Sequence, residues 1–158
     1  MTLISKVTLS REKGGDNPNK VWREFIDRLT YAVYAAGGPW HFTDLLNHLF
    51  CAITYEGTVY NGGIWFYFLD WSQLLTPAEV LAALKALGAD EHATLLEEAI
   101  GEFNQTSHVN PNATEEQDAQ ASALLHELDD RMNPSPTIDE IAKQVFVEHE
   151  ADLVDWVD

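Results

Sequence analysis

Hydrophobic residues recur at helical spacing along most of the chain. From Pro18 onward they fall three or four positions apart, which predicts an amphipathic helix. The residues of this stripe are Val21, Trp22, Phe25, Ile26, Leu29 and Val33. Gly37-Gly38-Pro39 predicts the end of the helix, because glycine accepts a left-handed backbone and proline cannot continue a helix. A second helix is predicted from about His41 to Tyr55, with Gly57 breaking it.

The run Ile64–Leu69 contains only large apolar residues, so its periodicity fits either a buried strand or a buried short helix. We expect a helix, because the surrounding segments are helical and no partner strand is evident. Asn61-Gly62-Gly63 precedes the run. We interpret this motif as structural: a tight turn into the helix, with the asparagine as its cap and a glycine at positive φ.

Four further helices have recognisable first residues. Thr76-Pro77-Ala78-Glu79, Thr114-Glu115-Glu116-Gln117 and Thr137-Ile138-Asp139-Glu140 are capping boxes, in which a threonine and an acid or amide three residues later cap the same turn. Asp90 is the expected cap of a helix that ends near Phe103. The helices that begin at the last two capping boxes are expected to be about 18 and 20 residues long.

These elements predict an all-α fold. The 158 residues suit one compact domain, which we place over residues 16–158 with about seven helices. Residues 1–15 are expected to form a short, loose N-terminal arm. One cysteine cannot form an internal disulfide, and we find no secretory signal or membrane-spanning stretch, so we expect a cytoplasmic protein.

Charge changes this picture. The chain has 26 acidic and 9 basic residues, for a formal net charge of −17. Residues 1–78 are nearly balanced, with 7 acids and 6 bases, whereas residues 79–158 contain 19 acids and 3 bases. Such a field repels nucleic acid and anionic membranes, and attracts basic proteins. Solubility alone is the plainer explanation of the acidity, but its confinement to one half favours a partner.

The acids on the later helices are the candidate partner-binding residues. These acids are crowded together with few lysines among them, and repulsion between neighbouring like charges lowers helix stability. A sequence selected for stability alone would intersperse lysines, so the arrangement favours selection for the negative electrostatic field itself. The candidates are Glu97, Glu98, Glu102, Glu115, Glu116, Asp118, Glu127, Asp129, Asp130, Asp139, Glu140, Glu148, Glu150, Asp152 and Asp155.

No pattern of catalytic residues is evident. Cys51 lies on the apolar side of its helix, where a free cysteine behaves as a small buried hydrophobe. The six histidines do not have the spacing of a zinc helix or a di-iron bundle, and no Gly-x-Ser-x-Gly elbow is present. We therefore expect neither an enzyme nor a metal or cofactor site.

Several segments carry a family resemblance. They are Tyr60-Asn61-Gly62-Gly63-Ile64-Trp65-Phe66-Tyr67-Phe68, Leu81–Ala89, Leu95–Ile100 and Leu128-Asp129-Asp130-Arg131-Met132. Together they resemble a bacterial helical domain of unknown function that is associated with an acidic DNA-mimic protein. The resemblance covers roughly residues 45–155. Ile64 and Phe66 depart from it, since the family pattern has phenylalanine and glutamine there.

This resemblance implies an all-α fold, dimerisation, and surface carboxylates that occupy the DNA-binding surface of a basic protein such as a transcription regulator. Two alternatives stay open. An immunity-type inhibitor of a cationic toxin would be equally small and acidic. A helical scaffold with a small-ligand pocket near Trp65 and Trp71 would use its acidity for solubility alone.

Overall fold

The longest helix of the protein lies at its centre. In the computed structural model, which describes residues 3–11, 17–38 and 41–157, this helix contacts four other helices and the π-helical turn that follows it. The described residues form β1 (Val7–Ser10), α2 (Pro18–Ala36), α3 (Asp44–Phe66), the π-helical turn η2 (Tyr67–Trp71), α4 (Pro77–Ala86), α5 (Asp90–Phe103), α6 (Glu115–Asp129), α7 (Ile138–Leu153) and β2 (Val154–Val157).

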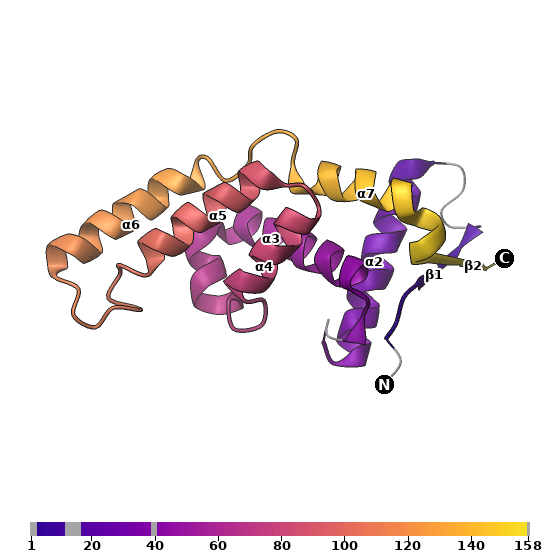
Figure 1. Cartoon of the computed structure of the whole chain (residues 1–158), viewed down its shortest axis with the longest axis horizontal. Coiled ribbons are helices and arrows are strands. Elements are labelled where there is room, and N and C mark those ends of the chain that lie inside the picture. Colours follow the sequence, from indigo (N-terminus) through magenta and orange to yellow (C-terminus); the bar gives the residue numbers. More distant parts are fainter. Residues whose placement is uncertain (1–2, 12–16, 39–40, 158) are drawn as a thin grey trace.

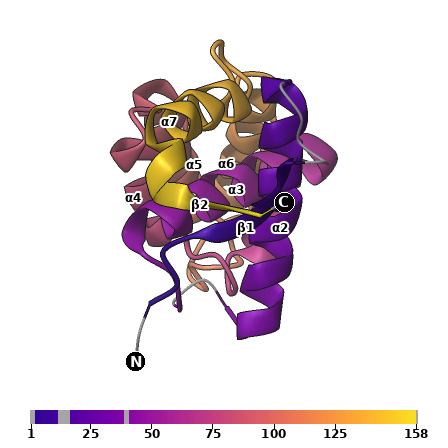
Figure 2. The ribbon, with the colours of Figure 1, turned by 90° about the vertical axis from the view of Figure 1, so that its right-hand side faces the viewer.

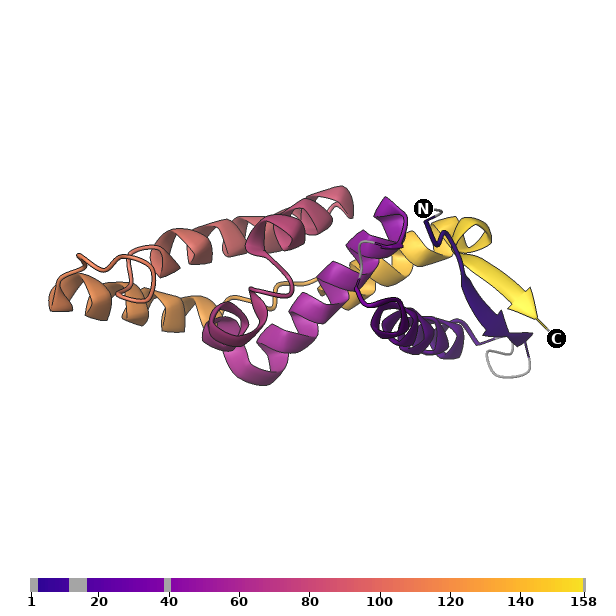
Figure 3. The ribbon, with the colours of Figure 1, turned by 90° about the horizontal axis from the view of Figure 1, so that it is seen from below.

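The molecule is elongated, and α3 bridges its two ends (Figures 1 and 3). The antiparallel helices α5 and α6 form one end, while α2, β1 and β2 form the other, where both chain termini lie. The all-α expectation is confirmed, with six α-helices in the described ranges against the seven or so that we expected.

The helices that begin at the three capping boxes start where those boxes predict, whereas the helix expected from about His41 begins at Asp44. Thr76, Thr114 and Thr137 each accept a hydrogen bond from the backbone three residues later, and Glu79, Gln117 and Glu140 complete the capping boxes. At the end of α2, Gly37 adopts the left-handed conformation with φ of 80°. Pro39, the other part of that expected stop signal, lies outside the described residues.

Gly57 does not end a helix, contrary to our prediction. The helix continues through it to Phe66, because Tyr55 and Thr58 on either side of Gly57 are buried and their packing outweighs the low helix propensity of glycine. The kink lies instead at Gly63, where φ is 77° and ψ is 175°. The run Ile64–Leu69 is helical as expected, and from Tyr67 it widens into the π-helical turn η2.

The expectation of a loose arm is wrong for Val7–Ser10. These residues form β1, which pairs in parallel with β2, and the side chains of Val7 and Leu9 are buried (Figure 2). The last helix is correspondingly shorter than predicted and ends at Leu153. A four-residue strand is too short for its alternating pattern to be recognised, and its partner lies at the far end of the sequence. Residues 1, 2 and 12–15 of the expected arm lie outside the described residues.

Aromatic packing joins α2 to α7. The rings of Phe25 and Phe146 lie 4.4 Å apart, and those of Trp22 and Phe146 lie 5.4 Å apart, as measured between ring centroids. All three side chains are buried. Large aromatic side chains contribute much of the burial energy of a small core, so this cluster fixes α7 along the N-terminal helix.

Candidate functional site

Helices α5 and α6, with the loop between them, form what we call the acidic hairpin, residues 90–131. The loop is held by Asp118, whose carboxylate accepts a hydrogen bond from the backbone N–H of Ser107 at 2.5 Å. This hydrogen bond holds the pKa of Asp118 below its usual range. Asp118 therefore orders the loop, and its charge is already engaged within the hairpin.

A groove of about 340 Å³ runs between α5 and α6. Gly101 lines it at a point where a side chain would meet open space, and four carboxylates and Arg131 also line it. The residues that line the groove are Glu97, Glu98, Gly101, Glu102, Leu124, Glu127, Leu128 and Arg131. A concave surface with four carboxylates attracts cationic groups, because their fields add across the groove.

Only part of the hairpin's charge is neutralised by its neighbours. Lys85 of α4 contacts Glu97 at 2.6 Å, and Arg131 contacts Glu98 at 3.0 Å. Five further candidates on the hairpin form no ion pair with any described residue: Glu102, Glu115, Glu116, Glu127 and Asp130. They lie on the hairpin's surface as available negative charge.

The candidates on α7 and β2 all have partners within the chain. At the start of α7, Asp139 accepts the indole N–H of Trp22, and Glu140 completes a capping box. Further along, Glu148 accepts from Gln144 and Glu150 from Trp156. Asp152 lies 3.9 Å from His149, a contact that is an ion pair only when the imidazole is protonated, and Asp155 of β2 lies 3.5 Å from Lys6.

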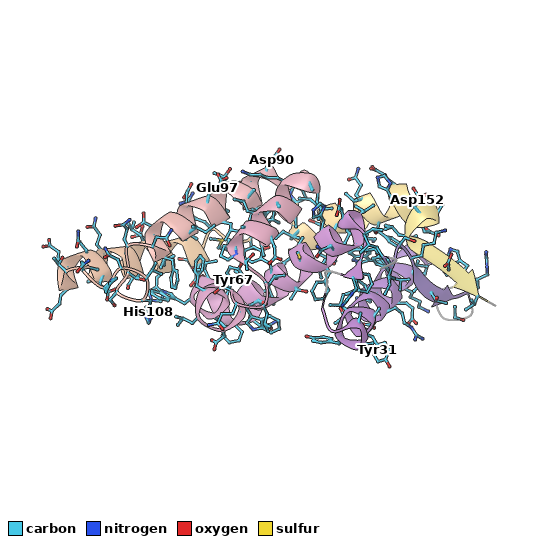
Figure 4. All side chains as sticks on the ribbon, turned by 60° about the horizontal axis from the view of Figure 1, so that its bottom comes forward. Tyr31, Tyr67, Asp90, Glu97, His108 and Asp152 are labelled. Atoms are coloured by element: carbon cyan, nitrogen blue, oxygen red, sulfur yellow. The ribbon has the colours of Figure 1, made fainter. Side chains whose placement is uncertain are left out.

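The fifteen candidates therefore form two groups, nine on the hairpin and six on α7 and β2. Figure 4 shows Glu97 of the first group and Asp152 of the second along one long edge of the molecule, with Asp90 between them and Tyr31 on the opposite edge. Asp90 and Glu91 are exposed acids at the start of α5 that our candidate set omitted. Asp90 is not the cap that we predicted, because Ala89 holds the cap position without a side-chain hydrogen bond and Asp90 is the first residue of the helix.

The Asn61-Gly62-Gly63 motif and Asp129 meet in space. The Asp129 carboxylate accepts a hydrogen bond from the backbone N–H of Ile64 at 2.6 Å. A Cβ on Gly63 would lie 2.9 Å from the other Asp129 oxygen, and one on Gly62 would overlap the Phe66 side chain. Both glycines are thus needed for close approach, and Asp129 is a structural residue rather than a free surface charge.

Asn61 is not the cap that we predicted. Its side-chain amide donates to the backbone carbonyl of Gly57 at 2.6 Å, and the capping oxygen comes from Asp129 on another helix. The positive φ predicted for a glycine of the motif is confirmed at Gly63. We call the contact between Asp129 and Ile64 the kink cap.

A sequence profile of DMP19-like proteins matches residues 41–158, about three quarters of the chain. The chain belongs to the DMP19-like protein family. Neither a comparison with curated proteins nor one with solved structures finds a match. The matched region contains both sides of the kink cap and the whole acidic hairpin, so these features lie within the part of the chain that defines the family.

The two tryptophans of the alternative ligand pocket lie in different surroundings. Trp65 packs against Phe103 and His108, with ring centroids 5.7 and 5.6 Å away. Trp71 instead lines an apolar groove of about 270 Å³ at the end of α2. The residues around that groove are Val33, Tyr34, Gly37, Gly38, Phe50, Thr54, Trp71, Leu74 and Leu75.

Cys51 is buried, as expected, and its thiol faces the side-chain oxygen of Asn47 at 3.2 Å. Burial, with the nearby Glu79 charge, raises the pKa of Cys51 to about 12. A thiol in this state is not a nucleophile at neutral pH. The described part of the chain has no group of three side chains suited to hold a metal ion, and none of its helices is both long and apolar enough to cross a membrane.

Replacing Gly63 by alanine should destabilise the fold by roughly 1–3 kcal/mol, because the new Cβ would require a strained backbone and would meet Asp129. Gly57→Ala is the matched control in the same helix. It adds a Cβ into open space and should stabilise by about 0.5–1 kcal/mol. Urea unfolding measures both changes. Equal effects of the two substitutions would contradict the assignment of the kink.

Asp129→Ala should cost about 1–3 kcal/mol, since it leaves the N–H of the buried Ile64 without an acceptor. Asp129→Asn keeps an acceptor oxygen and should recover part of that loss. The neighbouring Asp130 is exposed, and Asp130→Ala removes the same charge with an expected change within about 0.5 kcal/mol. If both alanine variants unfold at the same urea concentration, Asp129 is not a cap.

Proposed function

We propose that this chain is a binding protein that presents the acidic hairpin to a basic protein. One observation carries the proposal: among the described residues, five carboxylates of the hairpin form no ion pair and two of them, Glu102 and Glu127, line its groove, while each candidate acid of α7 and β2 has a partner within the chain. Unpaired surface charge of one sign steers an oppositely charged partner and speeds association. The partner is expected to dock with basic side chains in the groove.

The family membership supports a narrower proposal, that the hairpin imitates DNA. A helix of α6's 15 residues is roughly 22 Å long, and duplex DNA carries roughly 13 charges over that length. The hairpin alone is sparser than this. Two hairpins held in one assembly would approach the charge of a duplex, so mimicry of DNA fits a dimer better than a monomer.

We also propose where a second copy binds. Two copies that each carry −17 repel one another, so we expect them to meet through a face that places no like charges in close contact. Among the described residues, the apolar groove beside Trp71 is lined by no charged side chain, and Tyr34 and Leu74 on its rim are 68% and 73% exposed. Tyr31, one turn before Tyr34 on α2, lies on the edge opposite the acids (Figure 4). Pairing there leaves both hairpins facing outward.

An immunity-type inhibitor of a cationic toxin would use the same hairpin, so the identity of the partner decides between the two roles. The chain should be immobilised and exposed to lysate from its source cells at low salt, and the bound proteins eluted at about 0.5 M salt, where screening is short-ranged. A partner that binds duplex DNA, and that the chain displaces from that duplex, supports mimicry. A toxin whose activity the chain blocks supports the alternative.

Neutralising Glu102 and Glu127 to glutamine and Asp130 to asparagine should weaken binding of the captured partner by about tenfold or more, mainly through slower association, because three unpaired hairpin charges are lost, two of them from the groove. The matched variant Glu148→Gln, Asp152→Asn and Asp155→Asn removes the same charge from the other group. Surface plasmon resonance at several salt concentrations compares them. Equal weakening by both triples would show that net charge alone governs binding and would refute the role of the groove.

Leu74→Glu should convert a dimer to a monomer, because it places a charge in the proposed interface. Tyr60→Glu is the control, since Tyr60 is 81% exposed and does not line the apolar groove. Sedimentation velocity over a range of protein concentrations gives the result. A monomeric parent chain, or a Leu74→Glu variant that still dimerises, would contradict this interface.

A further inference from the structure

Two hydrogen bonds that share Asp139 connect α2, α3 and α7. The indole N–H of Trp22 on α2 donates to the Asp139 carboxylate on α7 at 2.8 Å. The backbone N–H of Asp139 donates in turn to the Glu56 carboxylate on α3 at 3.0 Å. Trp22 is 4% exposed, so its indole depends on this acceptor within the protein. We call these three residues the clasp.

Glu56 serves as an additional cap for the first turn of α7, but in an unfavourable electrostatic setting. Its carboxyl is half-buried, and Asp139 and Glu140 of α7 face it with like charge. It also lines a pocket of about 230 Å³, together with Asp129 from the end of α6 and with Tyr55 and Tyr60 of α3. Among the described residues, no cation lines this pocket, and Lys143 of α7 donates instead to Asn19.

Two opposing effects act on this carboxyl. Burial and the neighbouring Asp139 and Glu140 charges disfavour its ionised form, while the backbone N–H groups of Ile138 and Asp139 favour it. Burial is the largest effect, and the pKa of Glu56 is raised above its usual range. The folded protein therefore holds a proton on Glu56 at a pH where the unfolded chain has already released it.

We infer that Glu56 makes the clasp sensitive to acid, so that α7 is held more firmly when Glu56 is protonated than when it is ionised. A protonated Glu56 still accepts the N–H of Asp139 through its carbonyl oxygen, and it no longer repels Asp139 and Glu140. The inference concerns the attachment of α7 and does not depend on the proposed partner.

The direction of the effect follows from proton binding. Between the unfolded pKa and the raised folded pKa, the folded state binds more protons than the unfolded state, so stability falls as pH rises through this window. Other carboxylates of this acidic chain add a general trend in the same direction, because acidification lowers self-repulsion. A control at another glutamate is needed to separate the two.

Glu56→Gln supplies the test, because the amide oxygen keeps the acceptor and the charge is lost. Glu148→Gln, on the exposed part of α7, is the matched control. Urea unfolding should be measured at pH 7.5, 6.5 and 5.0. At pH 7.5 the equilibrium constant for unfolding of Glu56→Gln should be at least about twofold smaller than that of the parent chain, and this difference should shrink as pH falls. For Glu148→Gln the ratio to the parent should stay nearly constant.

A second measurement covers the case in which Glu56→Gln does not fold. Titration of the parent chain by NMR should show the Trp22 indole N–H resonance shifting with the protonation of the Glu56 carboxyl. The inference is overturned if Glu56→Gln is less stable than the parent at pH 7.5, if both glutamine variants share one pH dependence, or if the indole resonance does not follow Glu56.

Discussion

The kink cap is the contact on which the arrangement of this protein depends. The Asp129 carboxylate accepts a hydrogen bond from the N–H of Ile64, where Gly63 kinks the central helix, so the end of α6 is fixed near the end of α3. The next residue but one, Arg131, contacts Glu98 and thereby fixes the same segment to α5. A single short stretch thus contacts α3 and α5, and Gly63 leaves room on α3 for the Asp129 carboxylate.

Charge is separated on this frame. The central helix and the kink cap place the hairpin at one end and along one edge of the molecule, whereas the uncharged groove of Tyr34, Trp71 and Leu74 lies near the end of α2. The acids of α7 and β2 take part in caps, in the clasp and in contacts with Lys6 and His149. Acidity in this chain therefore has two uses: one part is structural, and the other remains available on the surface.

Interactions between residues close in the sequence could be predicted, whereas contacts between distant residues could not. Capping boxes at Thr76, Thr114 and Thr137 act within four residues, and each predicted helix start is confirmed. The kink cap joins residues 65 positions apart, and β1 pairs with the opposite end of the chain, so neither has a local signature. All fifteen candidate acids could be named from the sequence. Those that accept hydrogen bonds from distant residues, such as Asp129 and Asp139, could not be distinguished from acids without such a partner, such as Glu102 and Glu127.

We propose that the hairpin, rather than α7, meets a basic partner. Hydrogen exchange of the chain, free and bound to the partner captured at low salt, tests this most directly, because both groups of acids are read in one experiment. Slowed exchange on binding is expected in residues 97–102 and 124–131, with little change in residues 144–155. Protection confined to residues 144–155, with the hairpin unchanged, would contradict it.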